Sequence, residues 1–232
     1  MFEVLNVERS KVSPNIILRN RKDENKGVEA LYNLSFDPQF VMCRRIAWAQ
    51  RMNRGELITA AMYGKTVATL HAHIKPARSN HMTVIAGALE KIVAEVGRNT
   101  FRDNIRTFFD VLDGAYGIKK IAYRESATYM RGSFLWCLAD IFSTYQKVFF
   151  SGHKLVVDRT WVKKLALFPL DDPNMCKLAS AGGSSRDMLK EYIVRHLNSG
   201  KRTKRLGDKM GLDSDSLPAV GSEESESELA SA

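Results

Sequence analysis

The sequence has few cysteines and no long apolar run. Its 232 residues include three cysteines, an odd and scattered set that indicates neither a disulfide framework nor a cysteine metal site. They are Cys43, Cys137 and Cys176. The most apolar run, residues 134–150, is interrupted by Asp140 and Lys147, which argues against a membrane span. Because the N-terminus also has no basic leader before an apolar segment, we expect a cytoplasmic protein with no membrane contact.

Sequence signatures of catalysis and of cofactor binding are also lacking. Gly182 and Gly183 are followed by serines, not by the lysine of a phosphate-binding loop. His71 and His73 are two residues apart at the expected end of a helix, which directs them to different sides. With His81 they have no acidic metal ligand nearby. No serine elbow, carboxylate pair or Cys/His arrangement stands out, so we expect no catalytic residue, no metal ligand, no cofactor and no enzymatic activity.

Positive charge is in excess and is distributed unevenly. The chain has 35 lysine and arginine residues against 26 aspartate and glutamate residues, for a net charge of +9. Six of the acidic residues and no basic residue lie in residues 211–232, so residues 1–210 carry a net charge of +15. A compact body with this surplus favours a polyanionic partner, most often nucleic acid. A soluble basic protein without such a partner is the alternative.

The pattern of apolar residues predicts a mainly α chain with an N-terminal β portion. Strands are expected at residues 2–7, 15–19 and 30–36. Elsewhere apolar residues recur about every 3.6 positions, and capping residues flank most of these runs. Helices are therefore expected at about residues 38–52, 57–70, 82–96, 100–112, 126–150, 160–167 and 184–197.

Residues 30–65 have the order strand, capped helix, glycine-containing turn and helix. Asp37 and Pro38 are typical of a helix start, and Gly55 is typical of a helix end. This order and spacing resemble the ribbon-helix-helix family of DNA-binding modules. The resemblance implies that two chains pair their strands into an antiparallel ribbon, which lies in the DNA major groove. The alternative is an ordinary strand-helix-helix corner inside a protein core.

The ribbon-helix-helix resemblance also assigns contacts with DNA. The residues expected to face base edges are Leu31, Asn33 and Ser35. A carboxamide such as that of Asn33 bonds adenine on two atoms. The residues expected near phosphates are Asn53, Arg54 and Gly55 at the start of the second helix, with Arg44, Arg45 and Arg51 on the first.

Two segments in the C-terminal half carry a second resemblance. Residues 127–135 read Ala-Thr-Tyr-Met-Arg-Gly-Ser-Phe-Leu and are expected to open a long helix. Residues 207–212 read Gly-Asp-Lys-Met-Gly-Leu. Both segments, and the order of the expected elements, are similar to proteins encoded by integrating conjugative elements and related plasmids. This resemblance implies a mobile-element protein concerned with conjugation or its control, and no particular reaction.

Three regions are expected along the chain. Residues 1–75 form a DNA-binding and dimerising region, residues 76–200 a helical body, and residues 201–232 a basic run with a disordered acidic tail. We therefore expect a sequence-specific transcriptional regulator, an activator of conjugative-element genes, that binds double-stranded DNA as a homodimer. Its helical body would support dimerisation or contact RNA polymerase or a co-regulator. The alternative is a nucleocapsid-like protein that coats RNA or DNA without sequence preference.

Overall fold

The computed structural model describes residues 12–121, 128–170, 172–180, 184–199 and 206. The α-helices are α1 (Pro14–Asn20), α2 (Lys26–Leu34), α3 (Ala60–Leu70), α4 (Met82–Val96), α5 (Arg98–Tyr116), α6 (Gly132–Thr144), α7 (Gln146–Phe149), α8 (Arg159–Ala166), α9 (Pro173–Ser180) and α10 (Ser184–Asn198). Two short 3-10 helices are η2 (Ile118–Lys120) and η4 (Thr128–Met130). Strands β1 (Ile46–Ala47) and β2 (Ile58–Thr59) pair in parallel, and β3 (Phe150–Ser151) and β4 (Lys154–Leu155) form an antiparallel hairpin.

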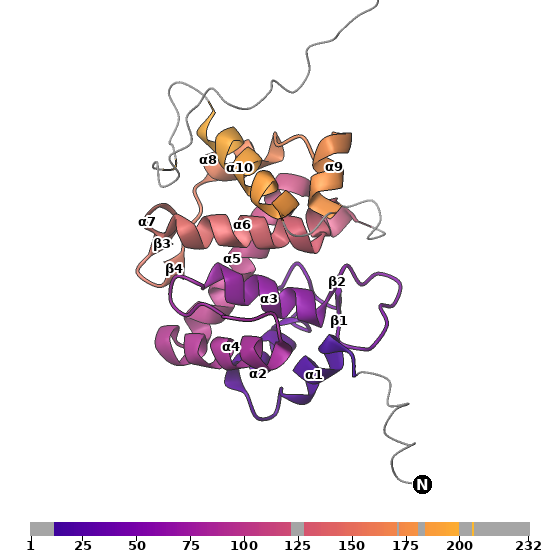
Figure 1. Cartoon of the computed structure of the whole chain (residues 1–232). Coiled ribbons are helices and arrows are strands. Elements are labelled where there is room, and N and C mark those ends of the chain that lie inside the picture. The colour runs from indigo at the N-terminus through magenta and orange to yellow at the C-terminus, as the bar shows by residue number, and fades with distance from the viewer. Residues whose placement is uncertain (1–11, 122–127, 171, 181–183, 200–205, 207–232) are drawn as a thin grey trace, which may run out of the picture.

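The helices form two packed halves that share the long helix α5 (Figure 1). In the lower half of the view, α1, α2, α3 and α4 pack together, and in the upper half α6, α8, α9 and α10 do so. Helix α5 contacts α2 and α4 as well as α8 and β4. The halves meet where α3 packs against α6, and one continuous core extends from Leu18 to Leu206.

The predicted mainly α class is confirmed, and several helices were predicted correctly. Helices α3, α4, α5, α8 and α10 lie close to where periodicity and capping residues placed them. At the start of α3, Thr59 Oγ1 accepts a hydrogen bond from Met62 N at 3.2 Å, and Asp158 caps α8 in the same way. None of the described helices is long and apolar enough to cross a membrane.

The strand expected at residues 30–36 is wrong, because these residues belong to α2 and the turn that follows it. Asn25 caps the helix, and its Oδ1 accepts a hydrogen bond from Val28 N at 2.9 Å. Val28, Leu31 and Leu34 then follow at helical spacing and are fully buried. The alternating pattern read from residue 30 onward missed the helical period that begins at Val28. Residues 30–65 therefore form no ribbon-helix-helix module.

The strand expected at residues 15–19 is also wrong. Ser13 and Pro14 begin α1 there, and Ser13 Oγ accepts a hydrogen bond from Ile16 N at 3.4 Å. The expected strand at residues 2–7 and the acidic tail lie outside the described residues. Within the described part of the chain, strand is limited to the four two-residue segments.

The helix expected at residues 38–52 is replaced by successive turns, by β1 and by the irregular segment that follows β1. The carboxylate of Asp37 does not start a helix but bonds Arg102 and Arg106 of α5 instead. Arg44 has a φ of +56°, a left-handed conformation that a right-handed helix excludes. Long-range contacts therefore override the local helix signal in this segment.

Two differences in the C-terminal half are smaller. The long helix expected at residues 126–150 is divided into η4, α6, α7 and β3. Helix α9 was not among the expected helices. Asp172 starts α9, and its Oδ1 accepts hydrogen bonds from Asn174 N at 2.7 Å and Met175 N at 3.2 Å.

A buried polar network joins α3, α5 and the hairpin. His71 Nδ1 lies 2.9 Å from Val67 O, and His71 Nε2 lies 3.1 Å from Asn104 Nδ2. Asn104 Nδ2 also donates to His153 O at 2.8 Å, and its Oδ1 accepts from Leu155 N at 2.8 Å. Because the amide nitrogen only donates, His71 Nε2 accepts, and the imidazole is neutral with its proton on Nδ1. Burial lowers the pKa of His71 to about 4.

Acidification is expected to destabilise the protein through His71. The imidazole pKa rises from about 4 in the folded chain to about 6.5 on unfolding, so the unfolded chain binds more protons between these values. The contribution of His71 to the free energy of unfolding is therefore fully present above pH 6.5. The free energy of unfolding falls by about 3 kcal/mol as the pH approaches 4. Urea titrations across this range measure the loss. His71→Gln is expected to reduce this pH dependence, although His73, whose pKa burial also lowers, still contributes to it. An undiminished slope in that variant would contradict the assignment to His71.

Candidate functional site

The structure does not bring the expected base-facing residues onto one surface. Leu31 is fully buried, and Ser35 is buried with its hydroxyl accepting a hydrogen bond from Trp48 Nε1 at 2.9 Å. Asn33 is exposed on α2, where its Nδ2 donates to Glu29 Oε1 at 3.3 Å. Because these residues lie on a helix and the turn after it, the expected base-reading strand face is not present.

The residues expected near phosphates differ in their surroundings. Arg45 Nη1 donates to Ile118 O at 2.6 Å and its Nη2 donates to Lys119 O at 3.2 Å, so its guanidinium holds η2 in place. The exposed members of the set are Arg44, Arg51, Asn53, Arg54 and Gly55. The N–H of Asn53 bonds the carboxylate of Glu56, and α3 begins only after β2. This turn therefore does not form the helix N-terminus that was expected to meet a phosphate.

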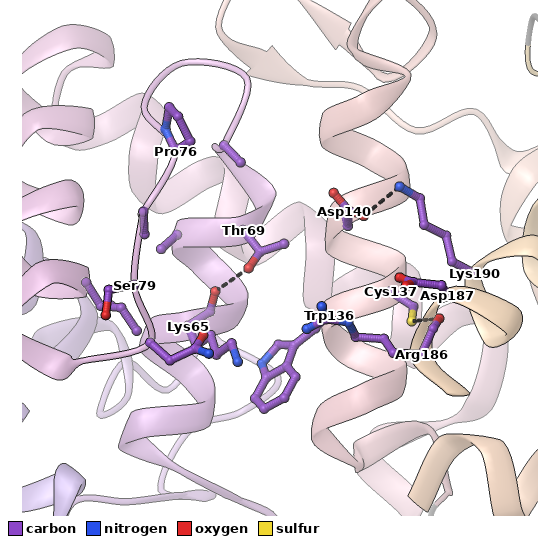
Figure 2. Close-up of a pocket in the computed structure, with 15 residues that line it drawn as sticks. Lys65, Thr69, Pro76, Ser79, Trp136, Cys137, Asp140, Arg186, Asp187 and Lys190 are labelled. Carbon is purple, nitrogen blue, oxygen red and sulfur yellow. Dashed lines mark hydrogen bonds and ion pairs between the residues drawn. The ribbon is translucent and has the colours of Figure 1, made fainter. Parts of the chain in front are cut away.

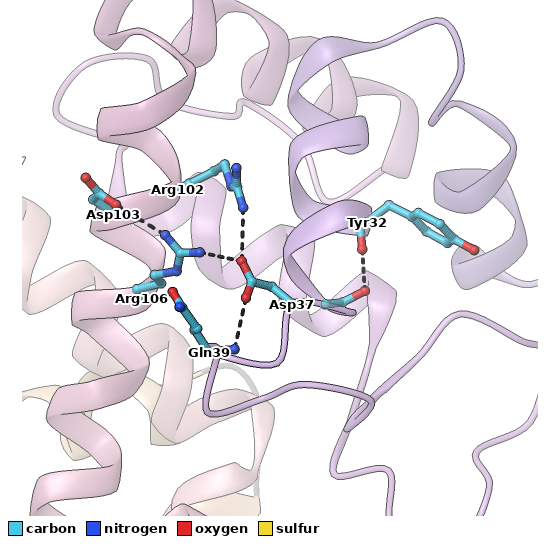
Figure 3. Close-up of polar contacts among 7 residues, drawn as sticks. Tyr32, Asp37, Gln39, Arg102, Asp103 and Arg106 are labelled. Carbon is cyan, nitrogen blue, oxygen red and sulfur yellow. Dashed lines mark hydrogen bonds and ion pairs between the residues drawn. The ribbon is translucent and has the colours of Figure 1, made fainter.

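Two further arginines are neutralised within the fold. The carboxylate of Asp37 lies 3.1 Å from Arg102 Nη2, bonds Arg106 Nη2, and accepts from Gln39 N at 2.9 Å (Figure 3). The Gln39 N–H and the Arg106 guanidinium hold the pKa of Asp37 below its usual value, against the opposing effect of burial. The Asp37 side chain is only 18 % exposed, so this cluster fastens the turns before β1 to α5. We therefore assign these charges a structural role.

The candidate site is a cleft of about 250 Å³ where the two halves meet (Figure 2). Its walls are α3 and the segment between α3 and α4 on one side, and α6 and α10 on the other. The charged residues that line it are Lys65, Asp140, Arg186, Asp187 and Lys190. These residues come from three helices, so the cleft exists only because α3 packs against α6 and α6 packs against α10.

Basic residues outnumber acidic ones in the lining of the cleft. Lys190 Nζ lies 2.6 Å from Asp140 Oδ2, which links α10 to α6, and the Lys190 side chain is 14 % exposed. The remaining charges are those of Lys65 and Arg186 against that of Asp187. The lining therefore favours an anionic group.

The rim of the cleft adds positive charge. Lys75 and Arg78 are exposed on the segment between α3 and α4. Pro76, Ala77 and Ser79, from the same segment, line the cleft. Neither of the two basic residues has an ion-pair partner among the described acidic residues. An anionic ligand in the cleft therefore finds unneutralised basic side chains both inside it and at its edge.

Trp136 presents an aromatic ring to the cleft. Lys65 Nζ, from α3, lies 3.6 Å from the ring centroid of Trp136, on α6. Partial burial and the nearby positive charge of Arg186 lower the pKa of Lys65. Trp136 Nε1 is buried and has no hydrogen-bond partner among the described residues. The cleft thus combines a movable cation, an aromatic ring and an unpaired N–H donor.

Cys137 also lines the cleft, but it is not an activated nucleophile. Its Sγ donates to Arg186 O at 3.2 Å, and burial raises the pKa of its thiol to about 12. The described residues contain no group of three or more histidine, cysteine, aspartate or glutamate side chains placed to hold a metal ion. The cleft offers an anionic ligand the basic side chains of Lys65 and Arg186 beside the ring of Trp136.

Sequence reasoning did not single out Lys65, Trp136, Arg186 or Lys190. The one local signal is the spacing of Arg186 and Lys190, which places both on one face of α10. Lys65 lies in a helix of small residues, and Trp136 lies in one whose apolar residues indicated a core position. Only the contact between α3 and α6 shows that these two side chains meet.

Comparisons with protein-family models, with curated proteins and with solved structures give no significant match to this chain. The similarity to proteins of conjugative elements therefore stays a prediction. The residues that carried the ribbon-helix-helix resemblance form α2, turns, β1, β2 and part of α3.

Proposed function

We propose that the protein binds nucleic acid in the cleft between its two halves and coats it without sequence preference. The observation that carries this proposal is the convergence of Lys65 and Arg186, from different helices, beside the Trp136 ring. Residues 1–210 of the sequence carry a net charge of +15, which suits a long polyanion better than a small anion. Lysine, arginine and tryptophan side chains contact phosphates and base faces, which all sequences share.

The hypothesis of a sequence-specific regulator has less support. It relied on paired strands at residues 30–36 to form a homodimer and to read base edges, and α2 occupies that position. Regulation of conjugative-element genes, and contact with RNA polymerase or a co-regulator, stay predictions. The electrostatic part of the hypothesis, affinity for a nucleic-acid backbone, is retained in the present proposal.

Charge reversal at the cleft is expected to weaken nucleic-acid binding far more than the same reversal elsewhere. We expect R78E/R186E to lower affinity for a single-stranded oligonucleotide about 100-fold at low salt, because two phosphate contacts become repulsive. The matched control is R159E/R195E, which changes net charge equally at two exposed sites. Arg195 lies nine residues after Arg186, on the opposite face of α10. Fluorescence anisotropy of a labelled oligonucleotide measures both variants.

The control defines what would contradict the proposal. Equal losses in the two double variants would show that net charge, and not the cleft, determines affinity. The same assay on oligonucleotides of different sequence separates coating from regulation, since coating predicts similar affinities and a strong salt dependence throughout. A recovered duplex motif with repeated half-sites would favour the homodimeric regulator instead.

A further inference from the structure

Trp136 differs from the other two tryptophans of the chain in its exposure. Trp48 and Trp161 are 5 % and 2 % exposed and belong to the core, whereas Trp136 is half-buried at the junction of α3 and α6 (Figure 2). A large aromatic ring in a polar, partly open cleft is not explained by core packing. Its position beside Lys65 and Arg186 indicates a role in ligand contact.

The surroundings of the Trp136 ring leave part of it available. The Lys65 ammonium covers the ring at 3.6 Å from its centroid, at the end of a flexible side chain. At the benzo edge of the indole, Cζ2 and Cη2 lie against Gly132, where an added Cβ would be 3.2 Å from each atom. Displacement of the Lys65 ammonium would uncover this face of the ring, next to the unpaired Nε1.

Building on the proposed function, we propose that one unpaired base of a single strand enters the cleft and stacks on Trp136 in place of the Lys65 ammonium. Lys65 then pairs with the neighbouring phosphate, and Trp136 Nε1, whose N–H lies in the plane of the indole, donates to a sugar or phosphate oxygen beside the ring. Every base has a π-face, so this stacking tolerates any sequence. In a duplex both faces of each base are covered by adjacent bases, so the site selects single-stranded over double-stranded nucleic acid.

The size and charge of the cleft fit this occupant. Its volume of about 250 Å³ is below that of pockets for drug-sized molecules, so it has room for one planar group and excludes a duplex. The Lys65 ammonium is already partly desolvated in the free protein, which lowers its pKa, and a phosphate partner restores a counter-charge. Arg186 in the lining and Arg78 at the rim provide contacts for the flanking phosphates.

Tryptophan fluorescence tests the stacking. The full-length protein is titrated with an oligothymidylate of about twelve nucleotides, while its affinity is measured separately by anisotropy of an end-labelled copy. We expect binding to quench emission in the wild type and to leave the emission of Trp136→Phe unchanged. We expect Trp136→Leu to weaken single-strand binding about ten- to hundredfold, and Trp136→Phe to weaken it less because a ring remains. Neither variant should alter affinity for a duplex of equal length.

The outcomes separate this inference from the proposed function. Binding without quenching, together with wild-type affinity in Trp136→Leu, would overturn base stacking and leave backbone binding intact. Absence of any binding would overturn both. If thymidine monophosphate quenches at the same concentrations as the oligonucleotide does, the cleft binds a free nucleotide, and the proposal of a single-strand site is overturned. If Trp136→Leu does not fold, Trp136→Phe still tests base stacking, through its loss of quenching and its affinity for the single strand.

Discussion

Gly27→Ala is expected to destabilise the protein by about 3 kcal/mol, because α2 and α4 meet backbone to backbone at this residue. A Cβ at Gly27 would lie 2.5 Å from the carbonyl carbon of Leu89, 2.7 Å from its oxygen and 2.8 Å from Glu90 N. No side-chain rotation relieves a clash with backbone atoms, so the two helices must separate. The melting temperature should fall by about 6 to 12 °C, which differential scanning calorimetry measures.

The same substitution at Gly87, Gly87→Ala, is the matched control. Gly87 lies inside α4, and a Cβ there would have no atom within 4 Å. Because glycine is unfavourable inside a helix, Gly87→Ala should stabilise the protein by about 0.5 to 1 kcal/mol. A wild-type melting temperature for Gly27→Ala would show that α2 and α4 do not approach as closely as the structure indicates.

Gly27 also bears on the cleft through α4. The close approach of α2 is reinforced by Asn25, whose Nδ2 donates to Ala86 O at 3.0 Å. Ile85, next to this contact, lines the cleft, and so do residues of the segment that leads into α4. The packing of α2 on α4 therefore supports the wall that carries the rim residues Lys75 and Arg78.

Asn104→Ala is expected to destabilise the protein by about 4 kcal/mol. The substitution removes the partners of His71 Nε2, His153 O and Leu155 N, and Asn104 and Leu155 are both buried. Each buried polar group left without a partner lowers the free energy of unfolding by about 1 to 3 kcal/mol. Hydrogen exchange should show the Leu155 amide losing its protection first, because Asn104 Oδ1 is its acceptor.

Two controls separate hydrogen bonding from volume at Asn104. Asn104→Asp keeps the shape of the side chain but replaces the donor amide, so it should destabilise the fold although it leaves no cavity. Asn99→Ala, at an exposed position in the first turn of the same helix, should change stability by less than about 0.5 kcal/mol. A stable Asn104→Asp variant at neutral pH would mean that cavity formation, and not the network, accounts for the loss in Asn104→Ala.

Sequence reasoning succeeded where a helix is amphipathic over its whole length. In α4, buried Ile85, Leu89 and Ile92 repeat at helical spacing, and a glycine follows the last turn. In α8, the Asp158 cap and the spacing of buried Trp161 and Leu165 likewise indicate a helix. Such helices can be predicted without knowledge of their tertiary contacts, because the helical period and the capping residue together exclude a strand.

The same reasoning failed where two periods compete within a short segment. Residues 30–36 alternate as a strand does, and only Val28, outside that window, reveals the helical repeat with Leu31 and Leu34. At residues 38–52 the helix signal of Asp37 and Pro38 was sound locally. It was outweighed by the ion pairs of Asp37 with α5, which lie more than sixty residues away in the chain.

The sequence by itself determined the mainly helical class, the bounds of several helices and the surplus of positive charge, because these follow from local spacing and composition. It did not determine which basic residues serve a partner. Tertiary packing decided that Arg102 and Arg106 form ion pairs with Asp37, while Lys65 and Arg186 meet at the Trp136 ring. The physical reason is that a charge acts over distances in space, and residues distant in sequence become neighbours only when α3, α6 and α10 pack.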